Sequence, residues 1–75
     1  MRTKVNERRA QFAAAIIEAG IDLNTDFFAL PHTDLTKLAD LAKVFKYKKP
    51  ANYPGCLARA FYYTAQRAYY RSLRG

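Results

Sequence analysis

Apolar residues between Val5 and Ala19 recur with the period of an amphipathic α-helix. At about 100° per residue, one side of this segment is apolar and the other is polar. The apolar side holds Val5, Phe12, Ile16 and Ala19, and the polar side holds Lys4, Glu7, Gln11 and Glu18. Gly20 follows at the position where a left-handed residue commonly ends a helix. We therefore expect a first helix that ends at Gly20. Arg9 lies near the edge of the apolar side. Either its aliphatic chain lies along the edge of the core with the guanidinium group in water, or the guanidinium group meets an acid, and we favour the first arrangement.

The sequence IDLNTDFFALPHTD connects this helix to the next one. Its DFFAL segment favours a single helical turn that Asn24 or Thr25 caps and that Pro31 ends. Because two aromatic side chains stand in so short a segment, we expect Phe27 and Phe28 to fill the core.

A second helix follows, and we expect Thr33 or Asp34 to cap it. Its apolar face consists of Leu35, Leu38, Leu41, Ala42 and Phe45. Its opposite face consists of Thr36, Asp40, Lys43 and Tyr47. The helix is expected to end before the sequence KYKKP, because the residue before Pro50 disfavours the helical conformation.

The helical period resumes near Pro54, which suits the first turn of a third helix capped by Asn52 or Tyr53, and it continues to about Leu73. The side of this helix that faces the core holds Leu57, Phe61, Ala65, Ala68 and Ser72, flanked by Tyr62, Tyr69 and Leu73. No segment alternates with the period of two that marks a strand. The sequence therefore predicts a single all-α domain over residues 1–75, a small three-helix domain with an additional short turn between helices one and two.

The composition excludes several classes of chemistry. A chain of 75 residues holds one domain near the lower size limit for a fold stabilised by packing alone. Its single cysteine, Cys56, allows no internal disulfide, and His32 is the only other soft ligand for zinc. We interpret Cys56 as a small buried residue and His32 as a loop residue. Without a nucleotide-binding motif or paired carboxylates, neither a cofactor nor catalysis is expected.

Features of the chain also bear on its location. The longest apolar run, FAAAII, is far too short to cross a bilayer, and the start of the chain lacks the apolar stretch of a secretory signal. A lone cysteine suits a reducing compartment. These features favour a cytoplasmic protein.

The net charge of +7 is distributed unevenly along the chain. Up to Asp40, five basic residues nearly balance six acidic residues. From Leu41 onward the sequence has no Asp or Glu, and it contains all six tyrosines. The basic residues there are Lys43, Lys46, Lys48, Lys49, Arg59, Arg67, Arg71 and Arg74. The second half of the chain is therefore the candidate interaction region.

The outer face of the third helix combines cations with tyrosine and glutamine. It carries Arg59, Tyr63, Gln66, Arg67, Tyr70 and Arg74, with Arg71 at its margin. Guanidinium groups bind phosphates, tyrosine rings stack on unpaired bases, and no acid on this helix repels a nucleic-acid backbone. Lys46, Lys48 and Lys49 precede this helix, whose N-terminal amides favour an anion. We predict a non-enzymatic nucleic-acid-binding protein, for DNA or RNA, that uses these residues as one positive surface.

Other interpretations share these residues. The basic face can be a solvated surface, or it can dock on an acidic protein, as an adaptor or inhibitor of the kind that mobile elements encode. A helix-turn-helix fits poorly, since the break from about Lys46 to Tyr53 exceeds its usual 3–4 residue turn. Membrane-surface binding would need the apolar side that the core requires. A homodimer is compatible with each of these functions.

Overall fold

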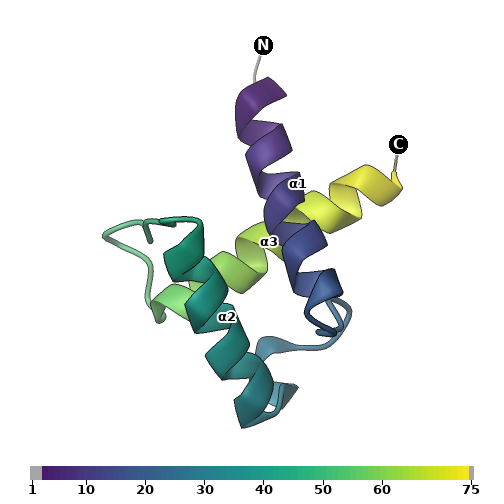
Figure 1. The fold of residues 1–75 in the computed structure, drawn as a ribbon. Coiled ribbons are helices and arrows are strands. Elements are labelled where there is room, and N and C mark those ends of the chain that lie inside the picture. Colours follow the sequence, from purple (N-terminus) through teal and green to yellow (C-terminus); the bar gives the residue numbers. More distant parts are fainter. Residues whose placement is uncertain (1–2, 75) are drawn as a thin grey trace.

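The computed structural model describes residues 3–74, with side chains described from Glu7 onward. The elements are α1 (Thr3–Glu18), a 3₁₀ turn η1 (Phe27–Ala29), α2 (His32–Val44) and α3 (Leu57–Leu73) (Figure 1). No strand forms within residues 3–74. The predicted all-α fold, with three helices and an additional turn between the first two, is confirmed.

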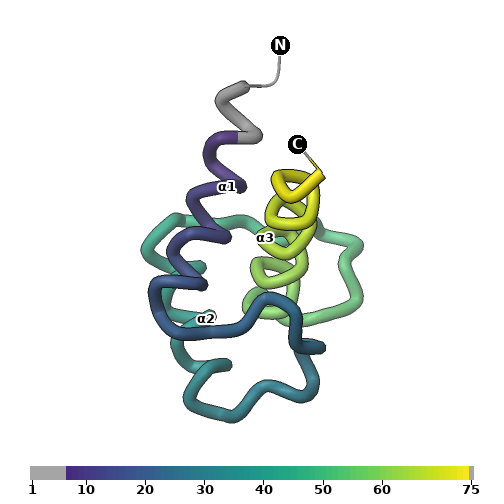
Figure 2. Tube along the Cα trace, turned by 90° about the vertical axis from the view of Figure 1, so that its right-hand side faces the viewer, coloured from purple at the N-terminus to yellow at the C-terminus, as the bar shows by residue number. Residues whose placement is uncertain are grey.

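The central element is α3, which packs against α1, α2 and η1. It runs across both of the other helices, as Figure 1 shows. In the view turned by 90°, the second half of α3 extends beside α1 at the end of the molecule away from α2 (Figure 2). Parts of α1 and α3 that are far apart in the sequence are therefore neighbours in space, and the candidate site lies where they meet.

The core takes side chains from every element. Its buried members are Phe12, Ala13, Ile16, Ile21, Leu23, Phe27, Leu30, Leu38, Ala42, Ala58, Phe61, Tyr62 and Ala65. Phe12 of α1 lies at the centre of an aromatic cluster, with its ring centroid 5.0 Å from Phe45 and 4.9 Å from Phe61. Tyr47, which the helical period placed on the polar face of the second helix, joins this cluster 5.7 Å from Phe12. Aromatic pairs of this kind add about 0.5–1.5 kcal/mol beyond the area that they bury, so the cluster joins α1 and α3 to the end of α2.

The position of Tyr47 corrects the prediction for a physical reason. α2 ends at Val44, so Tyr47 no longer follows the helical period that placed it opposite Leu41. The chain reverses at Lys46, where φ is 54°, and this turn directs Tyr47 back onto the core. The expected end of the helix before KYKKP is confirmed.

The end of α1 has the conformation that its glycine predicts. Gly20 has a φ of 88°. Its amide donates to the Ile17 carbonyl at 2.9 Å, and the Ile21 amide donates to the Ile16 carbonyl at 3.2 Å. These two bonds form a Schellman motif, which satisfies carbonyls that the helix end would otherwise leave free. Lys37 of α2 also donates to the Ala19 carbonyl at 3.2 Å, which ties α2 to the end of α1.

The same motif ends α2, but with a lysine at the left-handed position. The Lys46 amide donates to the Lys43 carbonyl at 3.0 Å, and the Tyr47 amide donates to the Ala42 carbonyl at 2.9 Å. A residue with a Cβ atom adopts this conformation at a cost, because the Cβ atom crowds the following carbonyl oxygen. Lys46 therefore holds a conformation that glycine would adopt more readily.

The short turn η1 forms where expected, but its details differ. Its cap is Asp26 rather than Asn24 or Thr25, and the Asp26 carboxylate accepts a hydrogen bond from the Phe28 amide at 3.1 Å. Phe27 is buried as predicted, whereas 70% of the Phe28 surface is exposed. Neighbouring residues of a 3₁₀ turn point in different directions, so a turn of three residues cannot bury both rings on one core.

The starts of the two later helices also differ from the sequence expectation. α2 begins at His32 after Pro31, without a side-chain cap from Thr33 or Asp34. The Pro31 carbonyl already accepts hydrogen bonds from the Asp34 and Leu35 amides, so the helix starts before the polar residues that were expected to cap it. His32 is consequently the first residue of a helix and not a loop residue.

α3 begins at Leu57, with the exposed Cys56 at the capping position. Pro54, Asn52 and Tyr53 lie before it, because the Tyr53 amide closes a turn on the Pro50 carbonyl at 3.1 Å. The interpretation of Cys56 as a buried residue was therefore wrong. The connection between α2 and α3 spans residues 45–56, far longer than the turn of a helix-turn-helix.

Tyr62 fastens α3 to the loop that follows α1. Its ring is fully buried, and its hydroxyl donates to the carbonyl oxygens of Asp22, at 2.9 Å, and Thr25. Burial raises the pKa of this hydroxyl to about 12, and the nearby Asp22 carboxylate adds to the shift. The helical period placed Tyr62 at the flank of the core-facing side, whereas the structure places it inside the core.

Candidate functional site

The structure divides the outer face of α3 into two parts that the helical period had joined. One part faces the loop after α1. There, the Gln66 side chain donates to the Leu23 carbonyl at 2.7 Å, and the Tyr70 hydroxyl donates to the Asn24 side chain at 3.2 Å. Tyr63 is half-buried, with its ring 6.2 Å from that of Phe27. These three predicted site residues therefore contribute to the fold; Tyr63 and Gln66 are half-buried, whereas Tyr70 is exposed.

Arg59 also belongs to this first part. Its guanidinium carbon lies 4.8 Å from the ring centroid of Phe28, 5.6 Å from that of Tyr63 and 5.9 Å from that of Tyr53. Cation–π contacts of this kind hold a guanidinium group at a fixed place. Its Nε atom is buried without a hydrogen-bond partner within the described part of the chain. Gly55 lies so close that an added Cβ atom would come within 2.7 Å of the Arg59 Cδ atom.

Two more of the predicted residues lie apart from any cluster. The Lys49 ammonium donates to the carbonyls of Pro50, at 3.2 Å, and Tyr53, at 3.1 Å, and so stabilises the loop before α3. Arg74 is exposed at the C-terminal end of α3 and is not among the residues that line the hollows between α1 and α3. Neither residue is among those that line the cleft described next.

The second part of the α3 face joins a cleft between α1, α3 and the segment after α2. We call it the basic cleft. Its largest hollow has a volume of about 500 Å³ and is lined by Arg8, Arg9, Phe12, Lys46, Tyr47, Lys48, Pro50, Thr64 and Arg67. Of the residues predicted from the sequence, Lys46, Lys48 and Arg67 are brought together here, and Arg71 adjoins them. No carboxylate is present among the lining residues, all of which belong to residues 8–71.

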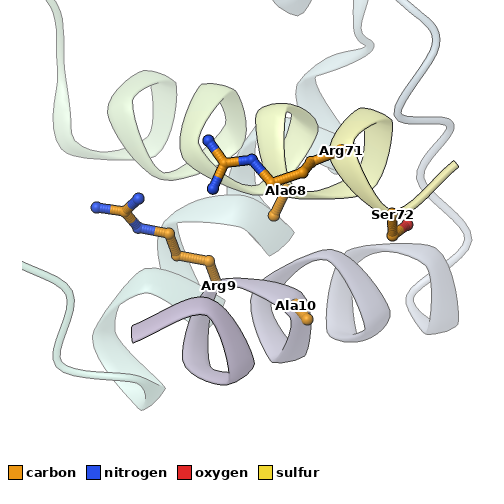
Figure 3. Close-up of a pocket in the computed structure, with 5 residues that line it drawn as sticks. All are labelled: Arg9, Ala10, Ala68, Arg71 and Ser72. Atoms are coloured by element: carbon orange, nitrogen blue, oxygen red, sulfur yellow. The ribbon is translucent and has the colours of Figure 1, made fainter. Parts of the chain in front are cut away.

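A narrower hollow of about 140 Å³ continues the basic cleft between α1 and α3. It is lined by Arg9, Thr64, Arg67, Ala68 and Arg71. A third hollow adjoins it and is lined by Arg9, Ala10, Ala68, Arg71 and Ser72. Figure 3 shows the side chains of Arg9 and Arg71 rising from facing helices and extending in the same direction, so that both guanidinium groups lie at one end of the groove.

Hydrogen bonds and a cation–π contact hold several lining residues of the basic cleft in place. Arg8 donates to the Phe45 carbonyl at the end of α2, and its guanidinium carbon lies 5.4 Å from the Phe12 ring centroid. A cation at a helix C-terminus is favoured by the helix dipole. The Tyr47 hydroxyl lies 2.9 Å from the Thr64 hydroxyl, and either group can donate. All four arginines of the cleft are exposed, and Arg8 has a structural role as well.

Sequence reasoning missed Arg8, Arg9 and Thr64. Counting charge along the chain placed both arginines in the neutral half, although α1 lies against α3 in the folded protein. The one feature of the sequence that could have indicated Arg9 as a site residue was its position at the edge of the apolar side of its helix. A residue at that edge borders the groove to the neighbouring helix, and the neighbour here supplies Arg67 and Arg71 rather than an acid.

No family model, curated protein or solved structure matches this chain. Within the described residues, no group of three or more histidine, cysteine, aspartate or glutamate side chains could hold a metal ion. No helix in the same part of the chain is long and apolar enough to cross a membrane.

Proposed function

We propose that this protein binds nucleic acid, without catalysing a reaction, and that the basic cleft contacts the phosphate backbone. The supporting observation is that three separate segments contribute cations to one cleft whose lining includes no carboxylate. These cations are Arg8, Arg9, Lys46, Lys48, Arg67 and Arg71. A concave surface with charge of one sign attracts an extended polyanion and raises its local concentration.

The lining favours phosphate contacts over contacts with bases. The aromatic residues of the basic cleft are Phe12, which is buried, and Tyr47, whose ring packs against Phe12 and Phe61. Phe12 is inaccessible to a base, and the half-buried Tyr47 ring is already engaged in edge contacts with two other rings. Phosphate contacts position a protein on nucleic acid but do not identify its sequence. We therefore expect binding with little sequence preference.

The proposal is tested by fluorescence anisotropy with labelled duplex DNA, single-stranded DNA and RNA at three salt concentrations. With about five phosphate contacts, the slope of log K against log salt on duplex DNA should be about −4.5. The double variant Arg67→Glu/Arg71→Glu should lose binding. The matched control is Lys43→Glu/Arg74→Glu, which changes the net charge equally but alters exposed residues that do not line the basic cleft. Equal affinities of the two double variants would refute the proposed surface.

The second candidate is docking on an acidic protein. It is favoured by the exposed Phe28 ring, which lies 4.8 Å from the guanidinium carbon of Arg59 on a surface separate from the basic cleft. Arginine and aromatic residues are enriched where interfaces concentrate their binding energy. The anisotropy experiment separates the candidates, because failure to bind any nucleic acid at low salt would favour a protein partner.

A further inference from the structure

The narrow hollow of the basic cleft concentrates three guanidinium groups from two helices. Arg67 and Arg71 lie four residues apart on α3, and Arg9 faces them from α1. We infer that Arg9, Arg67 and Arg71, with the Thr64 hydroxyl, form a binding site for a single phosphate group. The inference rests on the proposed function, because a phosphodiester of a nucleic-acid backbone is the natural source of that group, and free phosphate shares its chemistry.

The size and composition of the hollow suit such a group. Its volume of about 140 Å³ equals that of roughly four or five water molecules at about 30 Å³ each. A tetrahedral phosphate has five non-hydrogen atoms, so it fits with room for bridging water. Guanidinium groups present planar pairs of donors that match two phosphate oxygens, and several of them can approach one anion from different sides.

Thr64 can add an uncharged donor to this site. Its hydroxyl lies 2.9 Å from the Tyr47 hydroxyl, which itself lies 3.5 Å from the Ala60 carbonyl. When Tyr47 donates to Thr64, the Thr64 hydrogen is free for an anion in the hollow. The longer distance from Tyr47 to Ala60 makes that carbonyl the weaker of the two acceptors. Tyr47 thereby connects the aromatic core to the proposed phosphate site.

The cations also indicate that the site is adapted to binding rather than to stability. Like charges four residues apart destabilise a helix, and Arg9 adds a third positive charge across the groove. No carboxylate among the lining residues compensates for this repulsion. A bound phosphate would neutralise it, whereas the free protein would gain stability if one of the arginines lost its charge.

The first experiment titrates the protein with inorganic phosphate against chloride at equal ionic strength. NMR detection of the arginine Nε–H groups should show shifts for Arg9, Arg67 and Arg71, whereas Arg59 and Arg74 should stay constant. At a phosphate concentration several times the dissociation constant, the Tm should rise by about 4–8 °C. Absence of these selective shifts would overturn the inference.

The variant Arg9→Gln supplies the second readout, with Arg74→Gln as the matched control. Arg9→Gln should have a higher Tm than the unchanged protein in chloride and should lose the rise in phosphate. Arg74→Gln should keep the full rise, which also accounts for any general stabilisation by phosphate. A full rise in Arg9→Gln would contradict the inference.

A short duplex DNA as competitor separates this inference from the proposed function. If phosphate binds at the three arginines but no duplex binds at low salt, the phosphate site is supported and the nucleic-acid function fails. If Arg67→Glu/Arg71→Glu abolishes duplex binding while Arg9→Gln keeps full affinity and phosphate has no effect, the proposed function is supported and the phosphate site is refuted.

Discussion

Replacing Lys46 by glycine should stabilise the protein and weaken its binding at the same time. Lys46 has a φ of 54° in the motif that ends α2, and its side chain lines the basic cleft. A left-handed conformation costs a residue with a Cβ atom about 1–2 kcal/mol. Glycine avoids that cost but loses about 0.5–1 kcal/mol through its greater freedom in the unfolded chain. The expected net gain in the free energy of unfolding is about 0.5–1 kcal/mol.

The matched control is Lys46→Ala, which removes the same charge but keeps the Cβ atom. Urea denaturation followed by far-ultraviolet circular dichroism should place the midpoint of Lys46→Gly about 0.5–1 M above that of Lys46→Ala, for a slope of about 1 kcal/mol per M. In DNA binding the two variants should behave alike, each reducing the steepness of the salt dependence by about 0.9 through the loss of one phosphate contact.

Two outcomes would refute this reasoning separately. If Lys46→Gly is no more stable than Lys46→Ala, the left-handed conformation at this position does not carry the expected cost. If both variants bind duplex DNA with an unchanged salt slope, Lys46 does not contact phosphate and the basic cleft is smaller than described.

Three further predictions concern the fold. Gly20→Ala should lower the free energy of unfolding by about 1 kcal/mol, because an added Cβ atom meets no neighbour within 4 Å but the φ of 88° disfavours it; unchanged thermal stability would contradict this. Tyr62→Phe should cost about 1–3 kcal/mol, because the Thr25 carbonyl loses its donor while the Asp22 carbonyl keeps only the hydrogen bond from the Thr25 amide. Since burial raises the Tyr62 pKa from 10.0 to about 12, the folded state holds this proton more tightly, and stability should fall as pH rises from about 10 to 12. A denaturation series over that range should show a smaller loss in Tyr62→Phe than in the unchanged protein, and an equal loss would contradict the assignment.

The apolar period by itself determined the helical fold. Phe12, Ile16, Leu38 and Phe61 were all expected on inner faces and all are buried. Gly20 was expected to end α1 and does so. These features depend on interactions within a few residues, or on the tendency of one helix face to avoid water, and both can be read from the order of residues.

Tertiary structure alone decided which polar residues are available to a partner. Tyr63, Gln66 and Tyr70 share a face with Arg67 on the helical wheel, but the loop after α1 folds against that face and takes them as packing and hydrogen-bond partners. A helical period cannot foresee a loop that returns from about 40 residues earlier in the chain.

The sequence order likewise does not show which charged residues lie close together in the folded protein. The sequence by itself determined that the protein is basic and that its second half contains no acid. Only the crossing of α1 over α3 placed Arg9 beside Arg67 and Arg71, because electrostatic potential depends on distance in space and not on separation along the chain.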